Sequence, residues 1–143
     1  MTFSAFETYT ATFGITASVT PEAQNSDYEA GLARIGAEYW HIRTARTTPT
    51  KPGAFLAFWT RNADGVTTPF STGAVHAGLL VFVEQDGERG VFRFTASHLA
   101  KLGVTSDPAA GKRGFRVYPD WCMHLNATAT ATQRAQSAAF QAF

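Results

Sequence analysis

The sequence has little cysteine, almost no net charge and no long apolar run. Its 143 residues include a single cysteine, Cys122, which cannot form a disulfide within the chain. No apolar run reaches the length of about 18 residues that a transmembrane helix needs. The first segment, MTFSAFETYTATFG, lacks the basic and apolar regions of a secretory signal. We therefore expect a cytoplasmic protein with no disulfide and no membrane partner.

The signatures of common catalytic and metal sites are missing as well. There is no G-x-S-x-G sequence, and no two histidines have the H-x-x-x-H spacing of a zinc site. Gly111-Lys112 is followed by Arg113, where a phosphate-binding P-loop requires Ser or Thr. We expect no catalytic residue, no metal site and no cofactor, and the sequence favours a binding protein over an enzyme.

Three carboxylates alternate near the middle of the chain, at Glu84, Asp86 and Glu88. A metal-dependent nuclease needs clustered carboxylates of this kind to hold its ion. However, Asp86-Gly87 is a typical hairpin-turn step, which indicates a solvated acidic turn in place of a metal centre.

The apolar residues, at 45% of the sequence, are sufficient for the core of one domain spanning residues 1–143. Helical spacing and capping residues predict helices at residues 3–13, 20–27, 95–103 and 127–142. Alternating and apolar segments predict strands at residues 28–35, 39–47, 54–61, 78–84, 91–94 and 115–119. Helices do not alternate with strands, so we predict an α+β fold. The expected sheet is curved and mostly antiparallel, or a partial barrel, with about six strands and with N-terminal, middle and C-terminal helices.

The positive charges are grouped in two blocks, although the formal net charge is only +1. Residues 39–63 contain four cations and no acid, and residues 89–119 contain six cations and one acid. If the strands of these blocks are neighbours, a weakly charged protein can present one strongly basic face. The alternative is that the blocks lie on opposite sides and pair with the acidic segments between them.

The most concentrated part of the second block is GKRGFRVYP, at residues 111–119. In an extended chain, Phe115 and Val117 point to one side and Arg116 and Tyr118 to the other. We expect the first pair in the core and the second pair at a surface. Arg suits bidentate contact with phosphate or with a base edge, and Lys suits a point-charge contact.

Four segments in order resemble the MepB-like family: RTARTTPTKPGAFLAFWTR, GVFRFTASHLAKLGV, AGKRGFRVYPDW and ATQRAQSAAF. The resemblance extends from about Asn25 to the C-terminus and includes Gln133 and Gln136 near the end. It departs from the family pattern at Arg46, where Lys is usual, and at His76, where an acid is frequent. The resemblance implies a small bacterial cytoplasmic protein and the position of its site, and it implies no particular reaction.

These features predict a non-catalytic nucleic-acid-binding protein, for DNA more than RNA, with a basic groove lined by aromatic side chains. The expected contact residues come from both blocks and from the segment after them: Arg43, Arg46, Lys51, Arg61, Lys112, Arg113, Arg116, Tyr118, Trp121 and Gln133. One alternative is a metal-dependent nuclease or other phosphoester enzyme with an acidic site at Glu29 and Glu84. Another is a small-molecule or anion-binding module linked to drug response.

Overall fold

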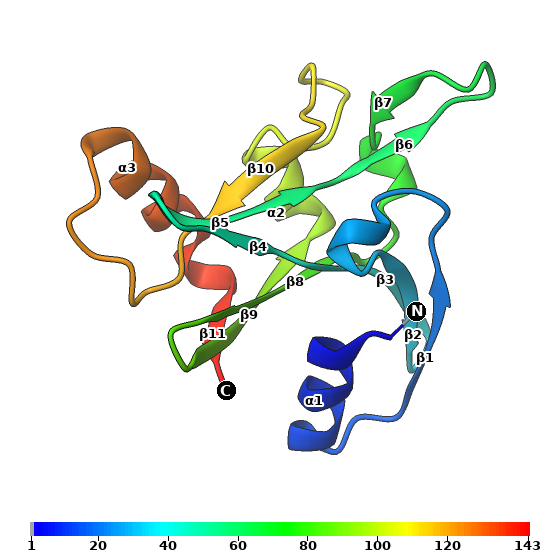
Figure 1. The fold of residues 1–143 in the computed structure, drawn as a ribbon. Coiled ribbons are helices and arrows are strands. Elements are labelled where there is room, and N and C mark those ends of the chain that lie inside the picture. Colours follow the sequence, from blue (N-terminus) through cyan, green and yellow to red (C-terminus); the bar gives the residue numbers. More distant parts are fainter. Residues whose placement is uncertain (1) are drawn as a thin grey trace.

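The largest element of the computed structural model, which describes residues 2–143, is a six-stranded sheet (Figure 1). Its strands lie in the order β1 (Ala17–Pro21), β2 (Gly31–Ile35), β3 (Glu38–Thr44), β8 (Gly78–Gln85), β9 (Glu88–Thr95) and β11 (Phe140–Ala142). All neighbours in this sheet are antiparallel except β3 and β8, which run parallel. The predicted α+β class and the curved, mostly antiparallel sheet are therefore confirmed, and the sheet is open.

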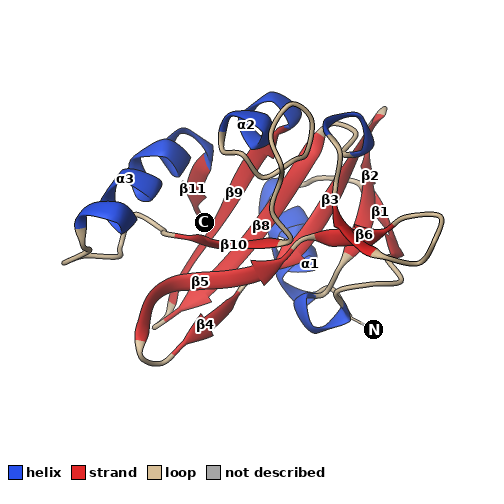
Figure 2. Cartoon of the chain, turned by 90° about the horizontal axis from the view of Figure 1, so that it is seen from above, coloured by secondary structure: helices blue, strands red, loops and turns tan. Residues whose placement is uncertain are grey.

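The chain between the parallel strands β3 and β8 builds most of a second, three-stranded sheet. Its strands lie in the order β10 (Gly114–Val117), β5 (Lys51–Ala57) and β4 (Arg46–Thr48). A two-stranded ribbon continues from it, formed by β6 (Trp59–Arg61) and β7 (Thr67–Pro69). Seen from above, β5 and β10 run across the long strands β8 and β9 (Figure 2). The predicted strand at residues 39–47 is thus divided at Ala45, where the chain leaves one sheet for the other.

The six-stranded sheet is covered on both faces, so its central strands are apolar on both sides. From β8, Leu79, Val81 and Val83 enter the core beneath the three-stranded sheet. The alternate residues Leu80 and Phe82 pack beneath the first helix. Alternate residues of β8 point to opposite faces of the sheet, and both faces are buried. The three-stranded sheet therefore packs against one face of the larger sheet, and α1 packs against the other.

Within residues 2–143, three α-helices and three single-turn helices complete the fold. They are α1 (Ser4–Phe13), η1 (Ser26–Tyr28), η2 (Thr72–Ala74), α2 (Ala96–Lys101), α3 (Ala127–Gln136) and η3 (Ser137–Ala139). The predicted helix starts of α2 and α3 are confirmed by their caps. Thr95 Oγ1 accepts a hydrogen bond from the N–H of His98, and Asn126 Oδ1 accepts one from the N–H of Ala129. Among residues 2–143, no helix is both long and apolar enough to cross a membrane.

The helix predicted at residues 20–27 is wrong. Thr20 and Pro21 belong to β1, where Pro21 lies opposite Gly31 of β2. Proline lacks the N–H of a ladder bond, but β1 is an edge strand, and an edge position tolerates that loss. The Thr-Pro-Glu pattern is equally typical of a helix start and of the end of an edge strand, and pairing with β2 decides between them.

Candidate binding groove

The three-stranded sheet brings the two basic blocks together on its outer face. Arg46 of β4 and Arg116 of β10 both lie directly opposite Phe55 of β5. Residues directly opposite one another share a face of a sheet, so the two arginines flank the Phe55 ring. The neighbouring positions, which include Leu56 and Val117, are fully buried on the other face. The expected assignment of Val117 to the core and Arg116 to a surface is therefore confirmed.

The guanidinium group of Arg116 joins β10 to the hairpin between β4 and β5. Its Nη1 donates to the carbonyl of Pro52 at 3.1 Å, and its Nη2 donates to Thr48 Oγ1 at 2.9 Å. The side chain is half-buried and keeps further N–H groups for a ligand. The guanidinium group of Arg116, from the second basic block, thus lies over the β4–β5 hairpin of the first basic block.

Phe55 lies on this outer face and remains 36% exposed. A Cβ atom added at Gly114 would lie only 2.7 Å from Phe55 Cζ, so the missing side chain of Gly114 makes room for the ring. Tyr28 meets Phe55 edge to face, with the ring centroids 6.2 Å apart. An exposed aromatic ring therefore sits between two arginines, although Phe55 was not among the predicted contact residues.

Three hollows lie beside α3: one of about 360 Å³, which includes Asp120 and Arg134, and two adjoining ones that share Arg116 and Tyr118. The larger of the adjoining two, of about 500 Å³, lies between α2, β10 and α3 and includes Lys101 and Lys112. The smaller, of about 260 Å³, lies between the β4–β5 hairpin and the start of α3 and includes Lys51. No carboxylate of residues 2–143 lines either of these adjoining hollows. We call the two adjoining hollows together the basic groove.

The wall formed by α3 is fixed to the edge of β10 by the side chain of Gln136. This side chain is 1% exposed. Its Nε2 donates to the carbonyl of Arg116 at 2.8 Å, and its Oε1 accepts from the N–H of Tyr118 at 3.0 Å. One amide group therefore satisfies two peptide groups of an edge strand, as a neighbouring strand would. In both cartoon views α3 lies beside the end of β10 (Figures 1 and 2).

Two of the predicted contact residues hold the protein together at this end. Gln133 Nε2 donates to the carbonyls of Pro119 at 2.9 Å and of Cys122 at 3.2 Å. Trp121 donates from Nε1 to Gln85 Oε1 at 3.0 Å, and its ring packs against the main core. Both side chains are half-buried, and their hydrogen bonds shape the loop after β10.

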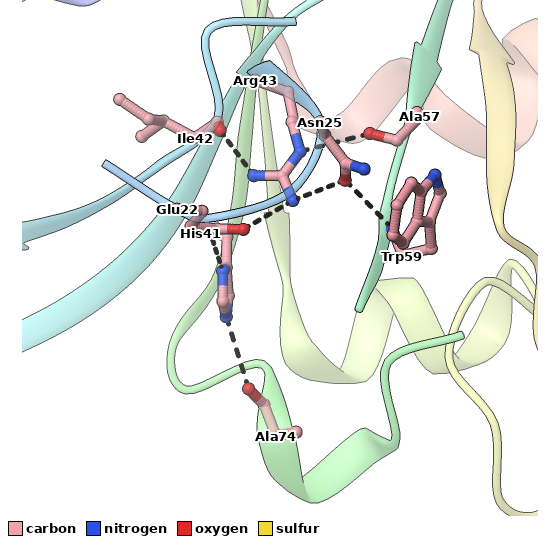
Figure 3. A network of polar contacts seen from close by, with 8 residues as sticks. All are labelled: Glu22, Asn25, His41, Ile42, Arg43, Ala57, Trp59 and Ala74. Carbon is pink, nitrogen blue, oxygen red and sulfur yellow. Dashed lines mark hydrogen bonds and ion pairs between the residues drawn. The ribbon is translucent and has the colours of Figure 1, made fainter. Parts of the chain in front are cut away.

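Arg43 is not at a surface, contrary to the prediction. Its side chain is 0% exposed and lies at the centre of a polar network (Figure 3). Nη2 donates to Glu22 Oε2 at 2.7 Å and to Asn25 Oδ1 at 3.1 Å. Nε donates to the carbonyl of Ala57 at 3.1 Å, close to the point where β5 gives way to β6. Arg43 therefore connects the β1–β2 segment to both sheets and cannot contact a nucleic acid.

Glu22 is the acidic partner in this network. Its Oε1 lies 2.6 Å from His41 Nδ1. Burial alone would raise the pKa of this carboxyl, but the hydrogen bonds and charges of His41 and Arg43 together hold the pKa below its ordinary value of 4.5. Burial in turn lowers the pKa of Arg43, and Glu22 opposes that change.

Because the pKa of Glu22 is lowered by folding, its ionised form stabilises the folded state. We expect this contribution to be complete above pH 4.5 and to be lost as the pH falls through the lower value of the folded protein. Urea unfolding at a series of acidic pH values measures the free energy of unfolding. The slope of this free energy against pH reports the contribution of Glu22. The slope should be smaller in Glu22→Gln than in the unaltered protein. An equal slope in Glu22→Gln and in the unaltered protein would contradict this assignment.

The remaining predicted residues are more scattered. Arg61 is exposed on the β6–β7 ribbon, which lies at the opposite end of the second sheet from α3 (Figure 1), and its guanidinium stacks over Trp59 at 5.2 Å. Arg113 is exposed just before β10. Of the two acids in the alternative site, Glu29 accepts a hydrogen bond from Thr44 Oγ1, and Glu84 lies opposite Arg89 at the end of β8. Within residues 2–143, no group of three or more His, Cys, Asp or Glu side chains is placed to hold a metal ion.

Lys101 belongs to the larger hollow but was not among the predicted contact residues. It lies in the last turn of α2, where a lysine is also explained by the helix dipole. The sequence does place Lys101 in the second basic block, and this grouping could have identified it as a contact residue. Lys101 and Lys112 line one hollow because the N–H of Lys112 donates to the carbonyl of Val104, just after α2, and no local pattern reports that contact.

The fold and the groove define an α+β protein in which a small sheet and a C-terminal helix form a basic groove on one face of a six-stranded sheet. A model of the MepB-like family matches residues 22–142, and the chain therefore belongs to that family. A solved structure described as the crystal structure of MepB is 33% identical, with a TM-score of 0.86. That similarity covers 99% of this chain and 97% of the other. No curated protein matches the sequence.

Proposed function

We propose that the protein binds nucleic acid, DNA in the first place, through the basic groove and without catalysis. The observation that carries the proposal is the composition of the groove. Lys51 from the first basic block and Lys112 and Arg116 from the second line adjoining hollows in which no carboxylate of residues 2–143 takes part. A concentration of uncompensated cations along a groove attracts a polyanion, even when the net charge of the protein is small.

The chemistry of the neighbouring surface supports the same ligand class. Phe55 is exposed between Arg46 and Arg116, which offers a nucleobase a stacking surface with cations on both sides. Tyr118 lines both hollows, and its ring lies against Gly53, where a side chain would collide with it at 2.8 Å. The groove therefore offers phosphate contacts, and the sheet beside it offers an aromatic contact.

Fluorescence anisotropy with short labelled DNA and RNA, at low and high salt, tests the proposal. Binding should weaken as salt rises, because each phosphate contact releases counterions. In the double variant Lys51→Ala with Lys112→Ala, we expect the affinity at low salt to fall about tenfold and the slope of affinity against salt to decrease by about one to two.

A matched control removes two cations from the opposite face of the large sheet. Arg89 and Arg93 are exposed on β9 and lie on the same side of that strand as Val91, which packs beneath α1. Arg89→Ala with Arg93→Ala removes the same total charge and should leave the affinity within about twofold, because those charges lie away from the groove. The proposal fails if neither DNA nor RNA binds at low salt, or if the two double variants lose affinity equally.

A further inference from the structure

The larger hollow of the groove has the size of a small-molecule site. Its volume of about 500 Å³ lies within the range of about 300–1,000 Å³ that such sites occupy. Leu102, Phe115 and Ala135 supply apolar surface to its lining, and Lys101 and Lys112 supply charge. A ligand that fills it therefore needs both an organic body and an anionic group.

The two lysines of this hollow have no acidic partner. Both ion pairs formed by residues 2–143 involve Glu22, which lies in the buried network around Arg43. Lys101 and Lys112 are exposed, and they come from different elements, the end of α2 and the segment before β10. Two ammonium groups that line one hollow from different elements can both approach a single anion bound there.

The edge of β10 adds backbone donors on the same side. The N–H of Phe58 donates to the carbonyl of the directly opposite Arg113, which makes this a hydrogen-bonded pair of the antiparallel ladder. By alternation, Gly114 and Arg116 turn their peptide groups away from β5. The bond from Gln136 to the carbonyl of Arg116 agrees with that direction. The N–H groups of Gly114 and Arg116 therefore face the side on which the hollow lies.

We infer that this hollow binds one nucleotide through its phosphate monoester, with the lysines and the edge N–H groups on the phosphate and the nucleoside against the apolar wall. Hydrogen bonds from charged donors to a phosphate are about twice as strong as those between neutral groups. The nucleotide can be free or can be the phosphorylated end of a strand. The strand-end form rests on the proposed nucleic-acid binding, whereas the free form does not.

The first experiment uses the full chain with adenosine 5′-monophosphate as the probe, followed by calorimetry and thermal unfolding. We expect saturable binding and a higher melting temperature with the monophosphate, and neither with adenosine. Inorganic phosphate at the same concentration should give a much smaller shift, because it lacks the body that the apolar wall would hold. An equal shift with inorganic phosphate would overturn the inference.

The second experiment compares one labelled oligonucleotide with a 5′-phosphate and with a 5′-hydroxyl. We expect the phosphorylated strand to bind about tenfold more tightly, the effect of one well-placed charge-assisted contact. Lys101→Ala should bring the ratio of the two affinities close to one. Lys51→Ala, the matched lysine of the smaller hollow, should weaken both strands equally and preserve the ratio.

The outcomes separate this inference from the proposed function. If the monophosphate does not bind and the end group has no effect, while Lys51→Ala with Lys112→Ala still weakens binding, the nucleotide pocket is refuted and the proposed function stands. If the monophosphate binds to the unaltered protein but not to Lys101→Ala, and no oligonucleotide binds to either, the pocket stands and the proposed function is refuted.

Discussion

Replacing Arg43 with Met is expected to lower the free energy of unfolding by about 3–5 kcal/mol. The methionine fills a similar volume but leaves the Glu22 carboxylate without its arginine. It also leaves the carbonyls of Ile42 and Ala57 without the donors that they have now. Removing one partner of a buried ion pair, and the donors of buried carbonyls, is among the most costly changes in a folded protein. His41 remains as the other partner of Glu22. Urea unfolding followed by circular dichroism measures the loss.

The controls for Arg43→Met separate the loss of the pair from the loss of charge. Arg34→Met removes an exposed arginine on β2, and it should change the free energy of unfolding by less than about 0.5 kcal/mol. Adding Glu22→Gln to Arg43→Met should recover part of the stability, because the second change removes a buried carboxylate that has lost its arginine. A loss below about 1 kcal/mol in Arg43→Met would show that the network is not a principal support of the fold.

Replacing Gln136 with Leu is expected to cost about 2–4 kcal/mol of stability. Leucine occupies the buried position, but it cannot bond to the carbonyl of Arg116 or to the N–H of Tyr118. Each of these peptide groups then loses its partner at the edge of β10. We also expect faster hydrogen exchange at the N–H of Tyr118, because its present acceptor is the Gln136 side chain.

Gln141→Leu is the matched control for Gln136→Leu, since Gln141 is exposed on β11. Its effect on the free energy of unfolding should stay below about 0.5 kcal/mol. Gln136→Glu gives an intermediate test, because a carboxylate can still accept from Tyr118 but cannot donate to Arg116 when it is ionised. If Gln136→Leu and Gln141→Leu unfold at the same urea concentration, the amide does not hold α3 against β10.

Local patterns were sufficient for much of the fold. The alternation in GKRGFRVYP correctly separated the buried Val117 from the half-buried Arg116. The Asp86-Gly87 step correctly predicted the hairpin between β8 and β9, in which both turn residues have positive φ. Each of these features depends on a few residues that are neighbours in the chain. It can therefore be recognised in a single sequence.

The parts that sequence could not predict depend on contacts between distant segments. Arg43 has the composition of a surface cation, and it becomes internal because β3 is covered on both faces and Glu22 lies within reach. Gln133 matches the family pattern as a polar helix residue, yet its amide is taken up by the loop after β10. A local sequence does not reveal whether a strand is buried on both faces. It also does not reveal a hydrogen-bond partner that lies far along the chain.

The crossover between β3 and β8 also bears on the order in which the chain can fold. The β8–β9 hairpin joins neighbouring residues, whereas Arg116 meets the carbonyl of Pro52 across 64 positions of sequence. Contacts between such distant positions form slowly, because a long loop must close first. During synthesis on the ribosome, β10 and α3 emerge after the strands they complete. A chain stalled before Gln136 can already hold the β8–β9 hairpin, but it has no groove for a ligand to occupy.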